Sequence, residues 1–303
     1  MISRFKTLGT LAAMLVIAAL VAACGNQASA GDSSSGTVVV SSKDYNEGFV
    51  LGELLAQIIE RQTDLKVERK INLGGTMVNW EALKKGEVDI YPDYTGTGLM
   101  AILKRDVMKD PKEVYDLVQK EYNEQFKVKW LEPFGFNNTY ATAVSKELAA
   151  KHNLKTNSDL QKIAPQLVFG GEHEFFNRKD GYPGWIETYG LKFKDAKRMD
   201  ASLKYEAIGQ GEVDVIDAFS TDGELVTYGL TILEDDKQFF PPYDGVAVAR
   251  MDTLEKYPQL EKAVNLLAGK IDDETMQQLN YKTKEQGQDV EKVVTEFLDE
   301  LGL

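Results

Sequence analysis

Two stretches of the sequence, EALKKGEVDIYPDYTGTG from Glu81 to Gly98 and EAIGQGEVDVIDAFSTDG from Glu206 to Gly223, align with each other without a gap. In each stretch the end of a helix leads through a glycine turn into an apolar strand, which an aromatic residue and hydroxyl residues follow. The aromatic residue is Tyr94 in the first copy and Phe219 in the second. Units of helix, glycine and strand also recur by chance in α/β proteins, but we favour a duplicated lobe or two lobes that converged on one architecture.

Strand-like and helix-like segments alternate on both sides of these stretches, as is typical of an α/β fold with largely parallel sheets. The chain is longer than one compact unit usually is, so two lobes are the natural expectation. Because ligands of open α/β sheets bind beyond the carboxyl ends of strands, we expect Tyr94 and Phe219 to face each other across a cleft. The predicted strands span residues 37–40, 66–73, 88–91, 140–145, 167–169, 213–219 and 245–250, and the predicted helices span 47–63, 77–85, 111–126, 147–151, 184–189 and most of 252–303.

The first residues predict an export signal, because Arg4 and Lys6 precede an apolar run from Leu8 to Val21 and the small pair Ala22-Ala23. This run is shorter than the roughly 20 apolar residues that a transmembrane helix needs, and no basic cluster follows it. Cys24 is the only cysteine of the chain, so it cannot form an internal disulfide. It is expected to become the lipidated first residue of the mature protein.

The segment that follows this cysteine, GNQASAGDSSSG, is small and polar, which predicts a flexible tether. The sequence therefore predicts a signal peptide at residues 1–23, a lipidated cysteine with its tether at 24–36, and a folded body that starts at Thr37. The expected location is outside the cytoplasm, with the protein anchored to the cell membrane as a lipoprotein.

Composition and motifs argue against several classes of function. The chain has 35 basic and 48 acidic residues and a net charge of −13, which argues against binding to nucleic acid. His152 lies in a charged helical segment, and His173 lies between two glutamates that cannot converge with it on one metal. Gly74-Gly75-Thr76 lacks the lysine and further glycines of a phosphate loop. We therefore predict no catalytic residue, no metal ligand and no cofactor, so the protein is not expected to be an enzyme.

Aromatic residues gather at the predicted strand ends, beside a few cations and hydroxyls. They occur in six short segments: SSKDYNE (41–47), YPDYTGT (91–97), NNTYA (137–141), NRKDGYPGW (177–185), DAFSTDG (217–223) and FFPPYDG (239–245). With these segments, the chain resembles the substrate-binding proteins of osmoprotectant ABC importers, which take glycine betaine, choline, carnitine and proline betaine. The segments recur in the same order and at nearly the same separations, and the resemblance covers essentially the whole mature chain.

The resemblance implies a two-lobed periplasmic-binding-protein fold of the type II kind, with the ligand cleft between the lobes and two chain crossings as the hinge. Lobe I is expected to hold residues 37–136 plus 240–303, and lobe II residues 137–239. Such a protein, here expected to be a monomer, captures a small quaternary-ammonium ligand, closes around it and presents it to an ABC permease.

In this family four aromatic rings surround the trimethylammonium group, and the matching positions here are Tyr94, Tyr140, Phe219 and Tyr243. A quaternary ammonium has no N–H to donate, whereas ring faces attract its diffuse charge and bury its methyl groups. A single tyrosine is more often a packing residue than part of a binding site. Three tryptophans in helix or strand interiors are expected to be packing residues, namely Trp80, Trp130 and Trp185.

The resemblance also implies that Lys43, Thr97 and Arg178 hold the carboxylate of a zwitterionic ligand, with Arg178 able to offer two parallel donors. Phe219 stands where relatives commonly have tyrosine. Asn138 is also predicted to bind the ligand, and it provides a neutral amide where an acidic residue would attract a bare cation. These two features favour a zwitterion over choline. Near the first predicted helix, Asp44 and Glu47 are candidates for its N-terminal cap.

Other functions stay open at this level. Within the same class, the ligand could be ergothioneine, another trimethylammonium betaine that close relatives of the family import. An extracytoplasmic enzyme on the same scaffold, or a lipoprotein with a structural or adhesive role, are alternatives from other classes.

Overall fold

The computed structural model describes residues 36–178 and 181–303. The predicted signal peptide, Cys24 and residues 25–35 of the predicted tether lie outside the described residues. Among the helices of the described ranges, none combines the length and the apolar character that crossing a membrane requires.

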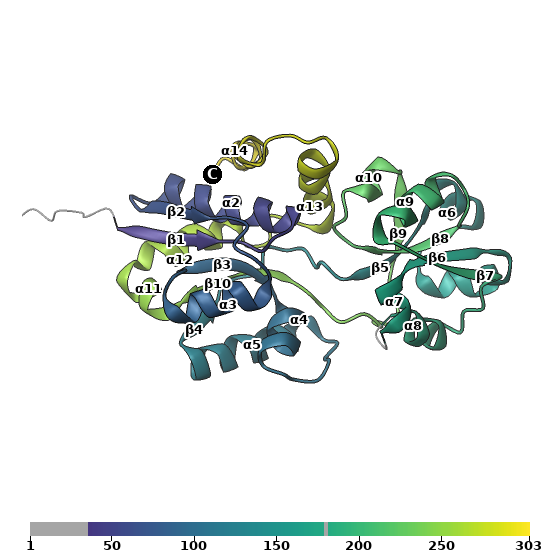
Figure 1. Ribbon diagram of the computed structural model, residues 1–303, viewed down its shortest axis with the longest axis horizontal. Helices are drawn as coiled ribbons and strands as arrows, with labels where there is room; N and C mark the ends of the chain where they lie inside the picture. The colour runs from purple at the N-terminus through teal and green to yellow at the C-terminus, as the bar shows by residue number, and fades with distance from the viewer. Residues whose placement is uncertain (1–35, 179–180) are drawn as a thin grey trace, which may run out of the picture. The chain divides into compact units, whose positions relative to one another are not determined.

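Ten strands and a larger set of helices alternate along the described chain (Figure 1). The strands are β1 (Thr37–Ser41), β2 (Lys66–Lys70), β3 (Ile90–Tyr94), β4 (Val128–Trp130), β5 (Tyr140–Ser145), β6 (Val168–Glu172), β7 (Asp195–Met199), β8 (Val215–Phe219), β9 (Leu230–Leu233) and β10 (Gly245–Arg250). The α-helices are α2 (Asn46–Gln62), α3 (Thr76–Lys85), α4 (Thr95–Thr97), α5 (Pro111–Phe126), α6 (Lys146–His152), α7 (His173–Asn177), α8 (Tyr182–Tyr189), α9 (Ala201–Gly209), α10 (Glu224–Thr227), α11 (Met251–Lys256), α12 (Pro258–Val264), α13 (Asp273–Asn280) and α14 (Val290–Leu301). Five shorter helical turns complete the set: η2 (Gly98–Ile102), η3 (Asn157–Lys162), η4 (Ala164–Gln166), η5 (Asn265–Leu267) and η6 (Tyr281–Glu285).

The strands form two five-stranded sheets with the same internal order. The first sheet runs β2-β1-β3-β10-β4 and the second runs β7-β6-β8-β5-β9. Strands β1, β2, β3, β10 and β4 of the first sheet therefore correspond in position to β6, β7, β8, β5 and β9 of the second. All strands of the first sheet lie within the ranges predicted for lobe I, and all strands of the second within the range predicted for lobe II, although the boundaries themselves stay a prediction.

The expectation of largely parallel sheets is met only in part, because each sheet is mixed: four strands run in one direction and one runs against them. β10 is antiparallel to β3 and β4, and β5 is antiparallel to β8 and β9. The reason is the chain crossing that precedes each of these two strands. β10 begins opposite Tyr94, the last residue of β3, and β5 begins opposite Phe219, the last residue of β8. Each crossing therefore delivers the chain to the carboxyl ends of the neighbouring strands, from which it can only run backwards.

The aligned stretches of sequence adopt equivalent structures in the two sheets, as α3 with β3 and as α9 with β8. Asp89 and Asp214, which match in the alignment, also make the same contact. The backbone N–H of Val39 donates to Asp89 Oδ2 over 2.8 Å, and the backbone N–H of Val168 donates to Asp214 Oδ2 over 2.8 Å. This shared bond supports a common architecture over a chance match, and it does not separate duplication from convergence.

The helices from α11 onwards pack back on the first sheet, as the sequence predicted. Apolar residues of α14, among them Val293, Val294 and Leu298, join Leu54 and Ile58 of α2 in one buried cluster. The amphipathic spacing of α14 places these side chains on one face of the helix. The helix begins after Asp289, whose side chain accepts from the backbone N–H of Lys292, and ends at Gly302 in the left-handed conformation.

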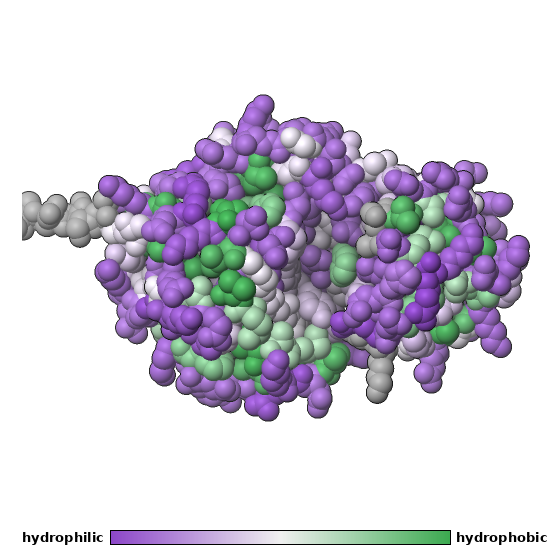
Figure 2. All heavy atoms as spheres, in the orientation of Figure 1, coloured by the Kyte–Doolittle hydropathy of each residue, from purple (hydrophilic) through white to green (hydrophobic). Residues whose placement is uncertain are grey.

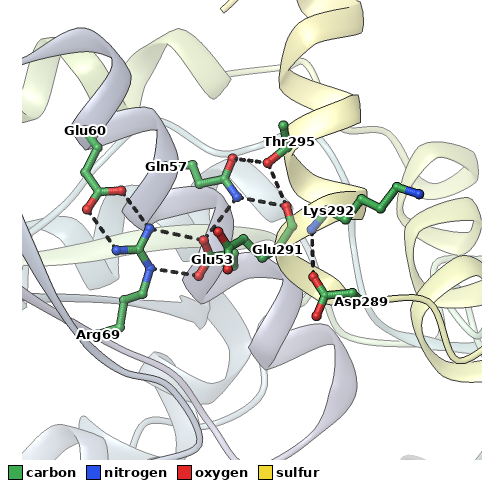
Figure 3. Close-up of polar contacts among 8 residues, drawn as sticks. All are labelled: Glu53, Gln57, Glu60, Arg69, Asp289, Glu291, Lys292 and Thr295. Carbon is green, nitrogen blue, oxygen red and sulfur yellow. Dashed lines mark hydrogen bonds and ion pairs between the residues drawn. The ribbon is translucent and has the colours of Figure 1, made fainter.

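A polar network reinforces this packing at the edge of the first sheet (Figure 3). Arg69 of β2 donates to both Glu53 and Glu60 of α2, with N to O distances from 2.7 to 3.2 Å. Gln57, one turn from each of these glutamates, donates to the backbone carbonyl of Glu291 over 2.9 Å and accepts from the Thr295 hydroxyl over 3.0 Å. The network thus joins β2, α2 and α14.

We predict that Gln57→Ala lowers the free energy of unfolding by about 1 to 3 kcal/mol, because it removes the buried amide that joins α2 to α14. The measurement is urea denaturation followed by circular dichroism. Gln125→Ala is the matched control, since Gln125 also donates to a glutamate four residues earlier but is exposed. Its effect is expected to stay within about 0.5 kcal/mol. Equal effects of the two substitutions would contradict the proposed importance of the network.

Candidate functional site

A cavity of about 510 Å³ lies where residues of both sheets and of the crossing segments meet. Its volume is within the usual range for small-molecule sites. Hydrophilic side chains cover most of the face drawn in Figure 2, which is hollowed between the two lobes. The cavity is lined by Tyr45, Asn46, Glu47, Tyr94, Asn138, Tyr140, Arg178, Phe219, Thr221, Asp222, Gly223, Glu224, Tyr243, Asn280 and Lys284.

Two of the lining rings come from neighbouring strands of the second sheet. Tyr140 begins β5 and Phe219 ends β8, and the two residues are direct cross-strand partners. Their ring centroids are 4.8 Å apart, with an angle of 25° between the ring planes. Cross-strand partners project from the same face of a sheet, so this register brings both rings to one place.

The other two rings come from the side of the first sheet. Tyr94 is the last residue of β3, which is the position that Phe219 holds in β8. Tyr243 lies just before β10, and its backbone N–H donates to Asn137 Oδ1 over 2.6 Å. A Cβ atom on Gly96 would lie 2.8 Å from carbon atoms of the Tyr243 ring, so only glycine lets the ring approach this closely. All four aromatic residues singled out in the sequence therefore line the same cavity.

A buried carboxylate, that of Glu47, lies beside these rings with an exposed fraction of 4%. Its Oε1 accepts from the Tyr94 hydroxyl over 2.6 Å and from Asn138 Nδ2 over 2.9 Å, and its Oε2 accepts from Asn280 Nδ2 over 2.8 Å. Burial raises the pKa of Glu47, and the hydrogen bonds that it accepts oppose this rise. The prediction that Asp44 or Glu47 caps the first helix is wrong, because the N-cap of α2 is Tyr45 and no side chain bonds there. The side chain of Glu47 is instead taken up by donors in the cavity wall.

Further acidic residues of the cavity wall follow β8. Asp222 accepts from the Tyr205 hydroxyl and, over 2.8 Å, from the backbone N–H of Phe219. Burial raises the pKa of Asp222, while these hydrogen bonds lower it. Glu224 forms an ion pair with Lys284 of η6, so the wall is closed by contacts between α10 and the C-terminal region.

Of three polar residues predicted to hold the ligand carboxylate, one lines the cavity and two do not. Arg178 lines the cavity and lies 3.9 Å from Glu174, measured from Nη1 to Oε1. Lys43 does not line it, because its Nζ is bound to Asp93 Oδ1 at 2.5 Å and lies 5.0 Å from the centre of the Tyr94 ring. Thr97 ends α4 and is also not among the lining residues. The predicted contacts of Lys43 and Thr97 with a ligand carboxylate stay predictions without support from this geometry.

Several lining residues were missed or misread in the sequence. Glu47 and Asp222 lie inside two of the six quoted segments, so their neighbourhood was a usable signal. Asn280 and Lys284 belong to the helical C-terminal region and carry no motif. The three tryptophans were interpreted correctly: each is at most 3% exposed and none lines the cavity.

Comparisons with known proteins show which family the chain resembles. Residues 36–300 match the family model OpuAC, described as the substrate binding domain of the ABC-type glycine betaine transport system. The carnitine transport binding protein OpuCC of Listeria monocytogenes is 38% identical over 270 residues, which is 88% of both chains. The ergothioneine transport permease/ergothioneine binding protein EgtU of Helicobacter pylori is 36% identical over 88% of this chain, which corresponds to 48% of that longer protein.

A solved structure has the same fold. The crystal structure of a glycine betaine/carnitine/choline ABC transporter protein superposes with a TM-score of 0.84 at 36% identity, over 87% of this chain and 98% of that one. The prediction of a two-lobed periplasmic-binding-protein fold is thereby confirmed. The chain belongs to the family of substrate-binding domains of ABC-type glycine betaine transport systems.

Proposed function

We propose that Tyr94, Tyr140, Phe219 and Tyr243 hold the quaternary ammonium group of the ligand that this binding protein captures for ABC-type import. The observation that carries the proposal is that these four rings, which come from both sheets and a crossing segment, line one cavity of about 510 Å³. The family consists of transporter binding proteins that act outside the cytoplasm and work with an ABC permease. A reaction of the protein's own is not part of the proposal.

The chemistry of the cavity suits a methylated cation. Ring faces attract a quaternary ammonium through their negative quadrupole, and each desolvated contact is worth about 1 to 2 kcal/mol. Buried Glu47 adds a carboxylate close to Tyr94, whose hydroxyl it holds at 2.6 Å. Donation to a carboxylate enriches the ring in electrons, so this bond favours a cation at the ring face.

The proposed ligands are glycine betaine, carnitine, choline or a related betaine. Ergothioneine is the second candidate, because the relative described as an ergothioneine binding protein is 36% identical over 88% of this chain. Ergothioneine shares the trimethylammonium group and is bulkier, so the same four rings could hold either kind of ligand.

Replacement of one ring tests the proposed cage. Tyr140→Leu keeps an apolar side chain but removes a ring face, so we expect the affinity for the best quaternary-ammonium ligand to fall about 5- to 30-fold. Isothermal titration calorimetry of the mature chain with glycine betaine, carnitine, choline and ergothioneine is the measurement. Tyr115→Leu removes a tyrosine from α5 that does not line the cavity, and it should leave the affinity unchanged. Heat from none of the four ligands with the unmodified protein would defeat the proposal.

Arg178 is proposed to bind the ligand carboxylate through charge-assisted hydrogen bonds. We expect Arg178→Ala to weaken binding of a zwitterion by about 2 kcal/mol or more and to leave the affinity for choline, which has no carboxylate, nearly unchanged. The same titrations measure both affinities. Arg198→Ala, which removes an exposed arginine of β7 outside the cavity, is the control. Unchanged zwitterion binding in the Arg178 variant would remove this residue from the site.

We also propose that Cys24 carries the lipid that anchors the protein to the membrane, on the basis of the export signal that precedes it. When the chain is produced in bacteria, Cys24→Ser should move the protein from the membrane fraction to the soluble fraction, as followed by immunoblotting. Ser33→Ala, a change in the same tether, should leave it in the membrane fraction. Membrane retention of the Cys24 variant would exclude lipidation as the anchor.

A further inference from the structure

We infer that the preferred ligand carries an N–H or O–H donor in addition to its trimethylammonium group, and that Oδ1 of Asn138 accepts a hydrogen bond from this donor. The inference rests on the proposed function and narrows its ligand class. It makes Asn138, which the sequence predicted as a ligand-binding residue, a residue that determines specificity.

Asn138 lines the cavity, and only the nitrogen of its side-chain amide has a hydrogen-bond partner. Its Nδ2 donates to Glu47 Oε1 over 2.9 Å. Its Oδ1 is shielded from solvent and has no hydrogen-bond partner among residues 36–178 and 181–303. The orientation of the amide follows from the chemistry, because a flipped amide would place its oxygen against the carboxylate of Glu47. The carbonyl oxygen of Asn138 is therefore an acceptor without a donor in the described part of the chain.

A second lining residue also has a buried acceptor oxygen without a donor. Glu224 uses one carboxylate oxygen, Oε1, for the ion pair with Lys284, and its Oε2 is buried without a partner within the described ranges. Two unsatisfied acceptors thus belong to residues that line one cavity. Buried polar oxygens are normally hydrogen-bonded, so each is a place where a ligand donor is expected.

Two hydroxyl groups that lie near Glu47 already donate to other partners. Tyr45 donates to the Tyr94 hydroxyl over 2.6 Å, and Tyr94 in turn donates to Glu47 Oε1 over 2.6 Å. This chain directs both protons toward Glu47 and away from Asn138 Oδ1. Neither hydroxyl therefore serves Asn138 Oδ1, and we assign its donor to the ligand.

The available ligand chemistries differ in this respect. Glycine betaine has neither an N–H nor an O–H group, whereas carnitine has a hydroxyl and the imidazole-thione ring of ergothioneine has N–H groups. A ligand donor that satisfies this buried acceptor should raise affinity by about tenfold over a ligand without one. The presence of such a donor therefore separates these ligands from one another, although all three carry a carboxylate.

A double cycle of ligand and protein changes tests the inference by calorimetry on the mature chain. The ligand pair is carnitine and its analogue that lacks only the hydroxyl group, and the protein pair is the unmodified chain and Asn138→Ala. The unmodified protein should prefer carnitine by about tenfold, and the variant should lose this preference. In the N–H arm, Asn138→Ala should weaken ergothioneine binding by about tenfold more than glycine betaine binding. Asn265→Ala is the matched control, because Asn265 Oδ1 already accepts from the backbone N–H of Glu132 outside the cavity.

The outcomes separate the inference from the proposed function. An effect seen only with the carnitine pair supports the inference and identifies the donor as O–H. An effect seen only with ergothioneine supports it and identifies the donor as N–H. Equal affinities within the carnitine pair, together with equal losses of ergothioneine and glycine betaine in the variant, would overturn it while the cage proposal stands. A preference for carnitine over its analogue that persists in Asn138→Ala would also overturn the inference, because the acceptor would then be another residue. Absence of binding by every quaternary-ammonium compound would refute the proposed function itself.

Discussion

The geometry of the cavity depends on keeping one carboxylate, that of Glu47, out of water. Removing a charge from water costs several kcal/mol unless hydrogen bonds replace the lost hydration. Here the replacement comes from the end of β3, a crossing segment and α13, through Tyr94, Asn138 and Asn280. These donors are neutral, so the negative charge is dispersed without being cancelled. The same contacts that compensate for burial thus hold three separate segments around the cavity and leave it attractive to a cation.

The four rings form two equivalent pairs within this frame. Tyr94 and Phe219 end the corresponding strands β3 and β8, while Tyr243 precedes β10 and Tyr140 begins its counterpart β5. The antiparallel strand of each sheet starts beside the strand-end ring, because the crossing delivers the chain there. Two sheets with one strand order therefore supply the same two kinds of aromatic position. Such a repeated arrangement suits the proposed methylated cation, which has no preferred direction of hydrogen bonding.

Much of this could be predicted from the sequence, where local patterns reflect the physics. The repeated helix, glycine and strand unit identified Tyr94 and Phe219, because strand ends are local features. The mixed direction of the sheets could not be read from the same pattern, since it depends on where β5 and β10 enter after their crossings. Lys43 was predicted from the resemblance to bind a ligand. Its buried ion pair with Asp93 could not be predicted, because Asp93 is 50 positions away in sequence. Glu47 resembled a helix cap for a similar reason, since donors such as Asn280 lie far along the chain.

The C-terminal region supplies part of the cavity wall, so the cavity is completed late in the synthesis of the chain. Asn280 bonds to the backbone carbonyl of Thr221 as well as to Glu47, and Gln277 bonds to the carbonyl of Ser220. Both sheets are already encoded before α13 begins, yet the cavity lacks part of its wall until this helix and η6 are in place. A nascent chain that stops short of Asn280 would hold all four rings and still leave Glu47 without one of its donors. Recognition of the solute is thus among the last properties that the growing polypeptide acquires.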